Sequence, residues 1–154
     1  MKYYYLYNTV IGELCIAESD GFICNISSEL RCDDFQYFES ELIKYTFKSL
    51  NEYFNGKRKS FDDIPICLSG TEFQKKIWSE IRKIPYGKTV TYKLLSEHAG
   101  IQKGYRAVGH ACNKNPVLIL VPCHRVVGTN NNLTGFSAGI NNKKYLIDLE
   151  AEYV

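Results

Sequence analysis

The chain has 154 residues, enough for one ordinary domain or for two small ones that share a core. Its composition, 45% hydrophobic and 23% charged, is typical of a folded globular protein, and no apolar run approaches the roughly 20 residues of a membrane-spanning helix. The net charge is +2, but residues 1–70 carry 7 Lys/Arg and 11 Asp/Glu (−4) and residues 71–154 carry 12 and 6 (+6), which hints that the second half meets a polyanion.

The first part of the chain reads as short strands followed by one helix. Three β-prone runs, Lys2–Tyr7, Glu13–Glu18 and Phe22–Ser27, are separated by turn residues, and Ser19-Asp20-Gly21 suits a hairpin turn. Apolar residues at helical spacing then predict a helix from Phe38 to Asn55, which Gly56 is placed to end. The stretch Gly56–Gly70 breaks the periodicity and is our candidate linker.

The second part reads as mostly helical. Thr71 to Gln74 matches a capping box, and a helix is expected from there to Pro85, with Ile77 and Ile81 on its buried face. Thr91 is expected to cap a short helix through Ala99, with Leu94, Leu95 and Ala99 facing inward. A turn at Gly100–Gly104 and a further helix from Tyr105 to about Asn113 complete a helix-turn-helix pattern, which many helical hairpins without a ligand share.

Gly109 lies in the middle of the second of these helices, where glycine costs about 1 kcal/mol relative to alanine. The presence of glycine at position 109 therefore requires a structural or functional explanation. Close packing against a neighbouring helix is one explanation. The other is a thin helix face, rich in small residues, that lets the backbone approach a ligand such as the floor of a DNA groove.

The apolar run Val117–Val121 predicts a buried strand or extended segment that ends at Pro122, because proline cannot donate to a β-ladder. Cys123 then lies where a rigid element stops, and His124 is next to it. An inert buried thiol is one reading; the other is a nucleophile activated by histidine, provided that the backbone turns or a water bridges the two side chains. A histidine in that role needs an orienting carboxylate, and the candidates in the predicted helix Asn141–Glu152 are Asp148, Glu150 and Glu152, among which spacing does not choose.

The six cysteines do not require a disulfide framework in a chain of this size that we expect to lie in the cytoplasm, accessible to the nucleoid. No signal-peptide pattern precedes residue 15. The cysteines form no C-x-x-C pair and the histidines have no zinc-finger spacing, so we expect neither a metal nor another cofactor.

Residues 70–150 resemble the C-terminal domain of the O6-alkylguanine-DNA alkyltransferase (methylated-DNA–protein-cysteine methyltransferase) family. The resemblance is carried by GTEFQKKIW, IPYGKTVTY, RAVGHACNKNP, VPCHRVVG and GFSAG, in the family's order and near its spacing. It implies an α/β (α+β) protein: residues 1–67 as an antiparallel sheet plus a helix, ribonuclease H-like, and residues 68–154 as a mostly helical domain with a winged helix-turn-helix-like unit. It also implies irreversible transfer of the alkyl group from O6-alkylguanine, and possibly O4-alkylthymine, in duplex DNA to the protein's own cysteine, by a monomer that flips the nucleotide.

The resemblance implies a role for each matching residue. Cys123 is the expected acceptor, His124 its base through a water, Glu150 the carboxylate that orients the histidine, and Asn115 the hinge after the recognition helix. Arg106 is expected to fill the stack where the target nucleotide leaves, and Tyr92 to push on the phosphate and hydrogen-bond the guanine. The other expected DNA contacts are Ala107, Gly109, Ala111, Thr91 and Arg125, and the expected base pocket is formed by Val126, Ser137, Ala138 and Gly135.

Two alternatives use the same residues differently. A damage-binding module would flag lesions without repairing them, but the retained Cys123, His124 and Glu150 argue against it. A cysteine acyl hydrolase with a Cys123–His124 dyad would turn over continuously, and it leaves Tyr92 and Arg106 without a role.

Overall fold

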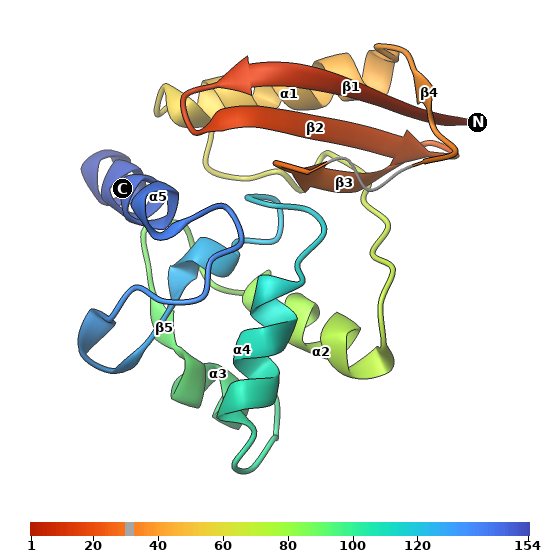
Figure 1. Cartoon of the computed structure of the whole chain (residues 1–154). Helices are drawn as coiled ribbons and strands as arrows, with labels where there is room; N and C mark the ends of the chain where they lie inside the picture. Colours follow the sequence, from red (N-terminus) through yellow and green to blue (C-terminus); the bar gives the residue numbers. More distant parts are fainter. Residues whose placement is uncertain (30–32) are drawn as a thin grey trace. The chain divides into compact units, whose positions relative to one another are not determined.

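The computed structural model describes residues 1–29 and 33–154, so Cys32 lies outside the described residues. Its internal contacts divide the chain into two units, Met1–Ser69 and Gly70–Val154, which we describe separately. The predicted α/β class is confirmed, with a sheet and one long helix in the first unit and mainly helices in the second (Figure 1). No described helix combines the length and apolarity that crossing a membrane requires.

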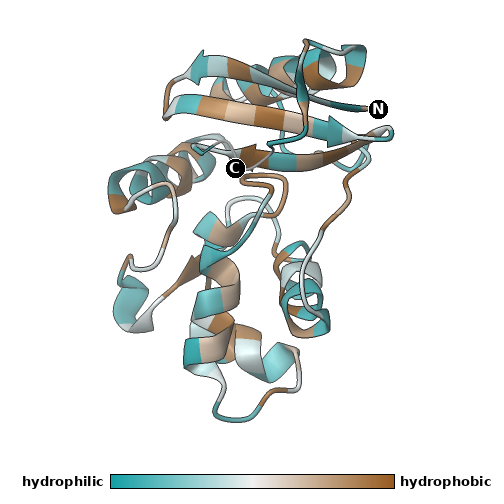
Figure 2. Cartoon of the chain, turned by 45° about the vertical axis from the view of Figure 1, so that its right-hand side comes forward, coloured by the Kyte–Doolittle hydropathy of each residue, from teal (hydrophilic) through white to brown (hydrophobic). Residues whose placement is uncertain are grey.

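The first unit is built on a four-stranded sheet with strand order β3-β2-β1-β4. β1 (Lys2–Thr9), β2 (Gly12–Ser19) and β3 (Phe22–Ser27) pair antiparallel, and the short β4 (Gln36–Tyr37) pairs parallel with β1. The predicted hairpin turn is present, with φ of 52° at Asp20 and 89° at Gly21, the left-handed conformations that such a turn needs. The middle of β2 is hydrophobic between hydrophilic ends and supplies core residues (Figure 2).

The helix of the first unit, α1 (Glu41–Phe54), starts three residues later than predicted. The backbone N–H of Phe38 donates to Tyr4 of β1 instead, and the Ser40 side chain caps the helix by accepting from the backbone N–H of Ile43. The stretch expected as a linker is not one over its whole length. Phe61 and Ile64 are buried, and Ile66 forms a parallel bridge with Ile23 of β3, so this segment belongs to the unit's core.

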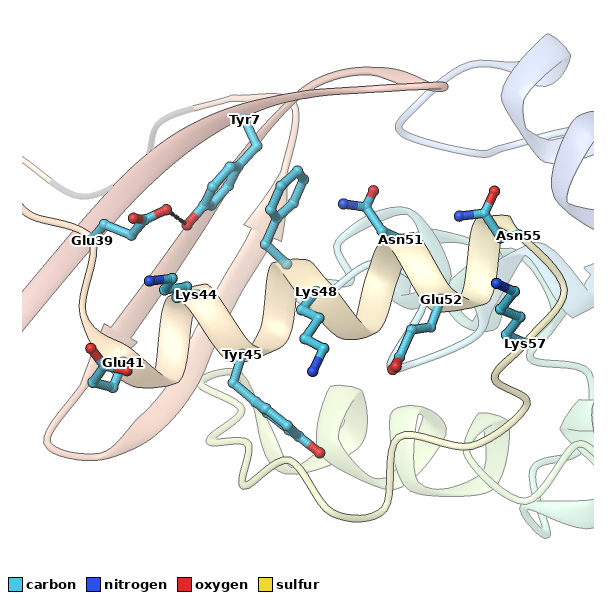
Figure 3. Close-up of a pocket in the computed structure, with 11 residues that line it drawn as sticks. Tyr7, Glu39, Glu41, Lys44, Tyr45, Lys48, Asn51, Glu52, Asn55 and Lys57 are labelled. Carbon is cyan, nitrogen blue, oxygen red and sulfur yellow. Dashed lines mark hydrogen bonds between the residues drawn. The ribbon is translucent and has the colours of Figure 1, made fainter.

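A hollow of about 760 Å³ lies over α1 in the first unit (Figure 3). Tyr7 forms part of its wall, donates a hydrogen bond of 2.5 Å to Glu39 and stacks on Phe47. Lysines and glutamates line the hollow in equal measure, and neither a cysteine nor a histidine is among its lining residues. It therefore offers none of the chemistry that the sequence analysis singled out.

The second unit begins with α2 (Glu72–Ile81), whose predicted capping box is confirmed at Thr71 and Gln74. α3 (Tyr92–His98) is capped by Thr91 as predicted, and α4 (Tyr105–Asn113) follows after a turn, which confirms the helix-turn-helix. The prediction for Leu94 was wrong, since 39% of its surface is exposed. A Cβ at Gly104 would lie 2.3 Å from the Ile101 side chain, so a larger residue in this turn would force that side chain to shift.

The segment Val117–Val121 is buried, but it does not form the predicted strand. Leu120 donates its backbone N–H to Leu118, and Ile119 has φ of 72°, so the chain makes a tight turn centred on a β-branched residue. The apolar composition of residues 117–121 therefore indicates that the segment is buried, but it does not indicate that the backbone is extended. β5 (Val90–Thr91) and β6 (Val126–Val127) form a small parallel pair, and α5 (Ile140–Tyr153) ends the unit.

Candidate active site around Cys123

The backbone bends sharply just before Cys123. Pro122 has φ of −80° and ψ of 64°, and the backbone N–H of Cys123 donates to Val121 at 2.8 Å, the geometry of an inverse γ-turn. A short 3₁₀ helix, η1 (Cys123–Arg125), follows and leads directly into β6. Because β6 pairs with β5, the residues after the thiol lie beside the start of α3, which carries Tyr92.

The thiol of Cys123 is only 3% exposed and is held in a polar cluster. Burial raises its pKa well above the usual value, and the influence of the Cys112 thiol raises it further. The Asn115 amide and the charge of Lys143 act on the pKa in the opposite direction, because both stabilise the thiolate. The resting thiol is therefore protonated and needs a base before it can act as a nucleophile.

Asn115 joins the end of α4 to the segment that precedes the thiol. Its side-chain amide donates to the carbonyl of Val121 at 2.7 Å and accepts from the N–H of Val117 at 2.9 Å. The side chain is 3% exposed, so these bonds are shielded from water. This arrangement suits the hinge expected at Asn115.

His124 is fully buried and its Nε2 lies 2.6 Å from a carboxylate oxygen of Glu150. Of the three carboxylates that spacing left open, Glu150 is therefore the one in contact; Asp148 is exposed and pairs with Lys144, and Glu152 is exposed. Burial lowers the pKa of His124, and the Glu150 carboxylate offsets part of this effect. A neutral imidazole is the form that can accept a proton.

Arg125 corrects one of our expectations, since it does not reach an exposed DNA-binding face. It is 8% exposed, donates to both carboxylate oxygens of Glu150 at 2.8 and 3.1 Å, and donates to the carbonyl of Ile84 at 2.7 Å. Burial alone would raise the pKa of Glu150, but the hydrogen bonds from His124 and Arg125 outweigh it and lower that pKa far below its usual value. Arg125 thus compensates a buried charge.

Lys143 is a member of this cluster that the sequence analysis missed. It is fully buried, and its ammonium donates to the carbonyl of Thr134 at 2.9 Å and to the hydroxyl of Tyr92 at 3.4 Å. Burial lowers its pKa, while negative charge on Cys112 or Cys123 would raise it. A signal was present in the sequence: Lys143 lies seven residues before Glu150, two turns along one face of α5, and it occupies the buried side of that helix with Leu146.

Tyr92 connects the buried cluster with an open hollow. Its hydroxyl donates to the carbonyl of Thr134 at 2.9 Å, and burial together with the two nearby thiols raises its pKa to about 12. The phenol therefore stays protonated at neutral pH and can act as a hydrogen-bond donor. Gly135 lies close to it, since a Cβ at that position would be 3.4 Å from the Tyr92 oxygen.

The hollow that Tyr92 lines, in the second unit, has a volume of about 590 Å³, within the range of small-molecule sites. Arg106, Lys93 and His110 are among its lining residues, and none of those residues is acidic. Gly109 also lines it, and a Cβ built on Gly109 meets no atom within 4 Å. Close helix packing therefore does not explain this glycine, whereas a thin helix face beside an open site does.

The remaining expected residues fall in different places. Ala111 is a second correction: it is 1% exposed and accepts a hydrogen bond from the Trp78 indole, so it lies in the core and not on the DNA-facing side of α4. Ala107 is exposed, and Thr91 lines the hollow. In the expected base pocket, Val126 is fully buried, Gly135 lines the hollow, and Ser137 and Ala138 lie in the turn before α5.

The described residues contain no group of three or more His, Cys, Asp or Glu side chains that could hold a metal ion.

Comparison with known proteins places both units in one family. Residues 2–68 match the ribonuclease-like domain of 6-O-methylguanine DNA methyltransferase, and residues 72–152 match its DNA-binding domain. The chain is 37% identical to the methylated-DNA–protein-cysteine methyltransferase of Methanosarcina acetivorans, over 96% of this chain and 97% of that protein. It is 36% identical to the constitutive enzyme of that name from Bacillus subtilis, over 97% and 96% of the two chains.

Solved structures give the same result. The crystal structure of Mycobacterium tuberculosis OGT in complex with DNA matches with a TM-score of 0.91 and 34% sequence identity, covering 99% of this chain and 94% of that one. A second Mycobacterium tuberculosis structure, titled O6-methylguanine methyltransferase, matches with a TM-score of 0.87 and 32% identity over 100% and 95% of the two chains. Together with the cluster around Cys123, these similarities show that the chain belongs to the 6-O-methylguanine DNA methyltransferase family.

Proposed function

We propose that this protein repairs DNA by direct reversal, transferring the alkyl group of O6-alkylguanine in duplex DNA to its own Cys123. One observation carries the proposal: a buried thiol lies in the same cluster as a His124–Glu150 pair and as Tyr92, which also lines an open hollow beside the helix-turn-helix. The family relatives bear the name methylated-DNA–protein-cysteine methyltransferase, and a similar structure contains DNA. We therefore assign DNA as the partner of the second unit, which carries the +6 charge.

The proposed chemistry starts with the proton of the Cys123 thiol. Nε2 of His124 is engaged with Glu150, so the proton passes through a water to Nδ1, the other ring nitrogen. The thiolate attacks the alkyl carbon, the C–O6 bond breaks, and the guanine leaves with the bonding electron pair. The product is a thioether, which has no carbonyl for water to attack, so each molecule acts once.

Tyr92 and Lys143 have complementary parts in this proposal. Tyr92 donates a proton or hydrogen bond to the departing guanine, which its raised pKa permits at neutral pH. The Lys143 ammonium, fully buried and within hydrogen-bond distance of the Tyr92 hydroxyl, lowers the cost of negative charge on the thiolate and on the phenolate.

The DNA-binding part of the proposal rests on the hollow and on α4. A guanine inside a duplex is out of reach, so the nucleotide must be flipped out at a cost of a few kcal/mol. Arg106 is exposed on α4 beside the hollow, which supports a role in filling the gap in the stack, and Ala107 and Gly109 give that helix a face of small residues. Val126, Ser137, Ala138 and Gly135 then form the proposed base pocket. Phosphate contacts make binding weaken as salt concentration rises.

We further propose that the protein acts as a monomer in the cytoplasm, where DNA is accessible, and without a metal or another cofactor. The nucleophile, its base and the proton donor are all side chains of the second unit. Discrimination for alkylguanine over other lesions is assigned to the base pocket.

The deciding experiment is a mass spectrum of the protein after incubation with duplex DNA that contains O6-methylguanine. We expect one methyl group on the peptide that holds Cys123, in proportion to the lesion supplied and with no further turnover. A spectrum without this adduct, under conditions where the DNA is bound, would contradict repair and favour the module that only flags damage. Continued turnover on a thioester would instead favour the acyl hydrolase.

Arg106→Ala is expected to slow methyl transfer from duplex DNA by at least about tenfold, because the flipped state loses the side chain that fills the stack. Transfer from a short single strand should change by less than about twofold, since no stack has to be opened there. Rates on both substrates are measured by the methyl adduct on Cys123. Equal losses on the two substrates would refute the role of Arg106 in the stack.

A further inference from the structure

The turn between α2 and β5 reaches the buried ion pair of the candidate site. Lys88 donates its backbone N–H to the carbonyl of Pro85 at 3.1 Å, and Gly87, the third residue of the turn, has φ of 80°. These are features of a type II β-turn, which needs a positive φ at that position and therefore favours glycine. The turn thus fixes the positions of Tyr86 and of the backbone N–H of Gly87.

Three groups of this segment contact the pair formed by Arg125 and Glu150. The carbonyl of Ile84, just before the turn, accepts from Nη1 of Arg125 at 2.7 Å, and the guanidinium carbon lies 5.7 Å from the centre of the Tyr86 ring. A guanidinium over an aromatic ring at this distance makes a cation–π contact. The backbone N–H of Gly87 donates to Oε1 of Glu150 at 3.0 Å. The segment therefore contacts both members of the ion pair.

One carboxylate oxygen of Glu150 is shared between Arg125 and His124. Oε2 accepts from Nη2 of Arg125 at 3.1 Å and lies 2.6 Å from Nε2 of His124, while Oε1 accepts from Nε of Arg125 at 2.8 Å. A carboxylate alone would favour a protonated imidazole, which cannot accept a proton from a thiol. Burial, and then the positive charges of Arg125 and Lys143, lower the pKa of His124 against this effect. The charged groups that act on the imidazole are thus Glu150 and Lys143 of α5 and Arg125 of η1.

We propose that Tyr86 is a positioning residue for alkyl transfer: with its turn, it holds the Arg125 guanidinium across both oxygens of the Glu150 carboxylate. The carboxylate then orients the imidazole of His124 without keeping a proton on it. Tyr86 itself need not touch the thiol or the DNA, since it acts through Arg125. This role rests on the proposed function, whereas the charge state of His124 is measured without DNA.

The test is an NMR pH titration of the His124 imidazole in the full chain, together with the rate of methyl transfer as a function of pH. The signals of His124 are identified by their absence in His124→Asn. Tyr86→Leu keeps an apolar side chain but removes the ring that contacts the guanidinium. The titration midpoint of His124 should then move to higher pH by at least about 0.5, because the carboxylate favours the protonated imidazole once the guanidinium opposes it less. The acidic limb of the rate profile should move in the same direction.

Two variants control for effects of the substitution itself. Tyr86→Phe keeps the ring and should have both midpoints of the unmodified protein. Tyr145→Leu makes the same change at a tyrosine of α5 that is 37% exposed, and it should leave both midpoints where they are. Tyr86→Met serves the same purpose as Tyr86→Leu if the latter does not fold.

The possible results separate the positioning role of Tyr86 from a purely structural one. Slower transfer by Tyr86→Leu at every pH, with both midpoints unmoved, would overturn the proposal. Midpoints that move equally in Tyr86→Phe would also overturn it, because the ring is still present in that variant. A titration midpoint that moves as expected, in a protein that transfers no methyl group, would uphold the action of Tyr86 on His124 and contradict the proposed function alone.

Discussion

Cys123→Ala is expected to abolish methyl transfer from O6-methylguanine DNA while leaving affinity for the same DNA within about threefold, because the exposed residues that meet phosphates are untouched. The side chain is 3% exposed, and its backbone N–H still donates to Val121. We therefore expect only about 1 kcal/mol of lost stability from the small cavity. Transfer is measured as methyl mass on the protein, and binding is measured by fluorescence anisotropy of labelled duplex.

The control for this prediction is Cys67→Ala, which should transfer as the unmodified protein does. Residual transfer by Cys123→Ala, with the methyl group found on Cys112, would show that the neighbouring thiol can act as acceptor. Loss of DNA binding together with transfer would mean that Cys123 has a structural role, and would contradict the separation of binding from chemistry in the proposed function.

Local signals in the sequence predicted much of the fold. The capping box at Thr71 and the cap at Thr91 use side-chain oxygens to satisfy the first N–H groups of a helix, and both are where the pattern placed them. Such features depend on residues a few positions apart. The prediction that Gly56–Gly70 is a linker was wrong because it missed a contact between distant residues. Ile66 pairs with Ile23, more than forty positions earlier, and no local pattern indicates that contact.

For the candidate site, too, some residues could be identified from the sequence, whereas positions that depend on tertiary packing could not. The adjacent Cys123 and His124 were noticed in the sequence itself and Glu150 was selected only by the resemblance, and the model brings His124 and Glu150 into contact. Arg125 was expected, from the resemblance, to contact DNA; that expectation was wrong because its burial on Glu150 depends on how α5 packs against η1, which no local pattern indicates. Lys143 was overlooked because lysine is rarely buried, so its position on the apolar face of α5 was not weighed.

Glu150→Gln is expected to lower the free energy of unfolding of the second unit by about 3–5 kcal/mol, because it leaves a buried arginine without its counter-charge. The carboxylate is 2% exposed and accepts from His124, from Arg125 and from the backbone N–H of Gly87. Glutamine has the same size but no charge, and its NH₂ group would face the donors of Arg125. Transfer should also slow by at least about tenfold, since His124 loses the group that orients it.

The pH dependence provides a second measure of the same ion pair. The pKa of Glu150 is lowered in the folded protein, so its contribution to stability is fully present above the carboxyl's unfolded pKa of about 4.3 and is lost as pH falls toward the folded pKa. The difference between the unmodified protein and Glu150→Gln should therefore be largest near neutral pH and shrink in acid. Urea unfolding followed by the fluorescence of Trp78, the only tryptophan and buried in this unit, measures this difference in stability.

Glu152→Gln is the matched control, an exposed residue of the same helix whose replacement should change stability by less than about 0.5 kcal/mol. Equal stability of the two variants, or a difference that grows in acid, would contradict the assignment of Glu150 as the buried counter-charge of Arg125.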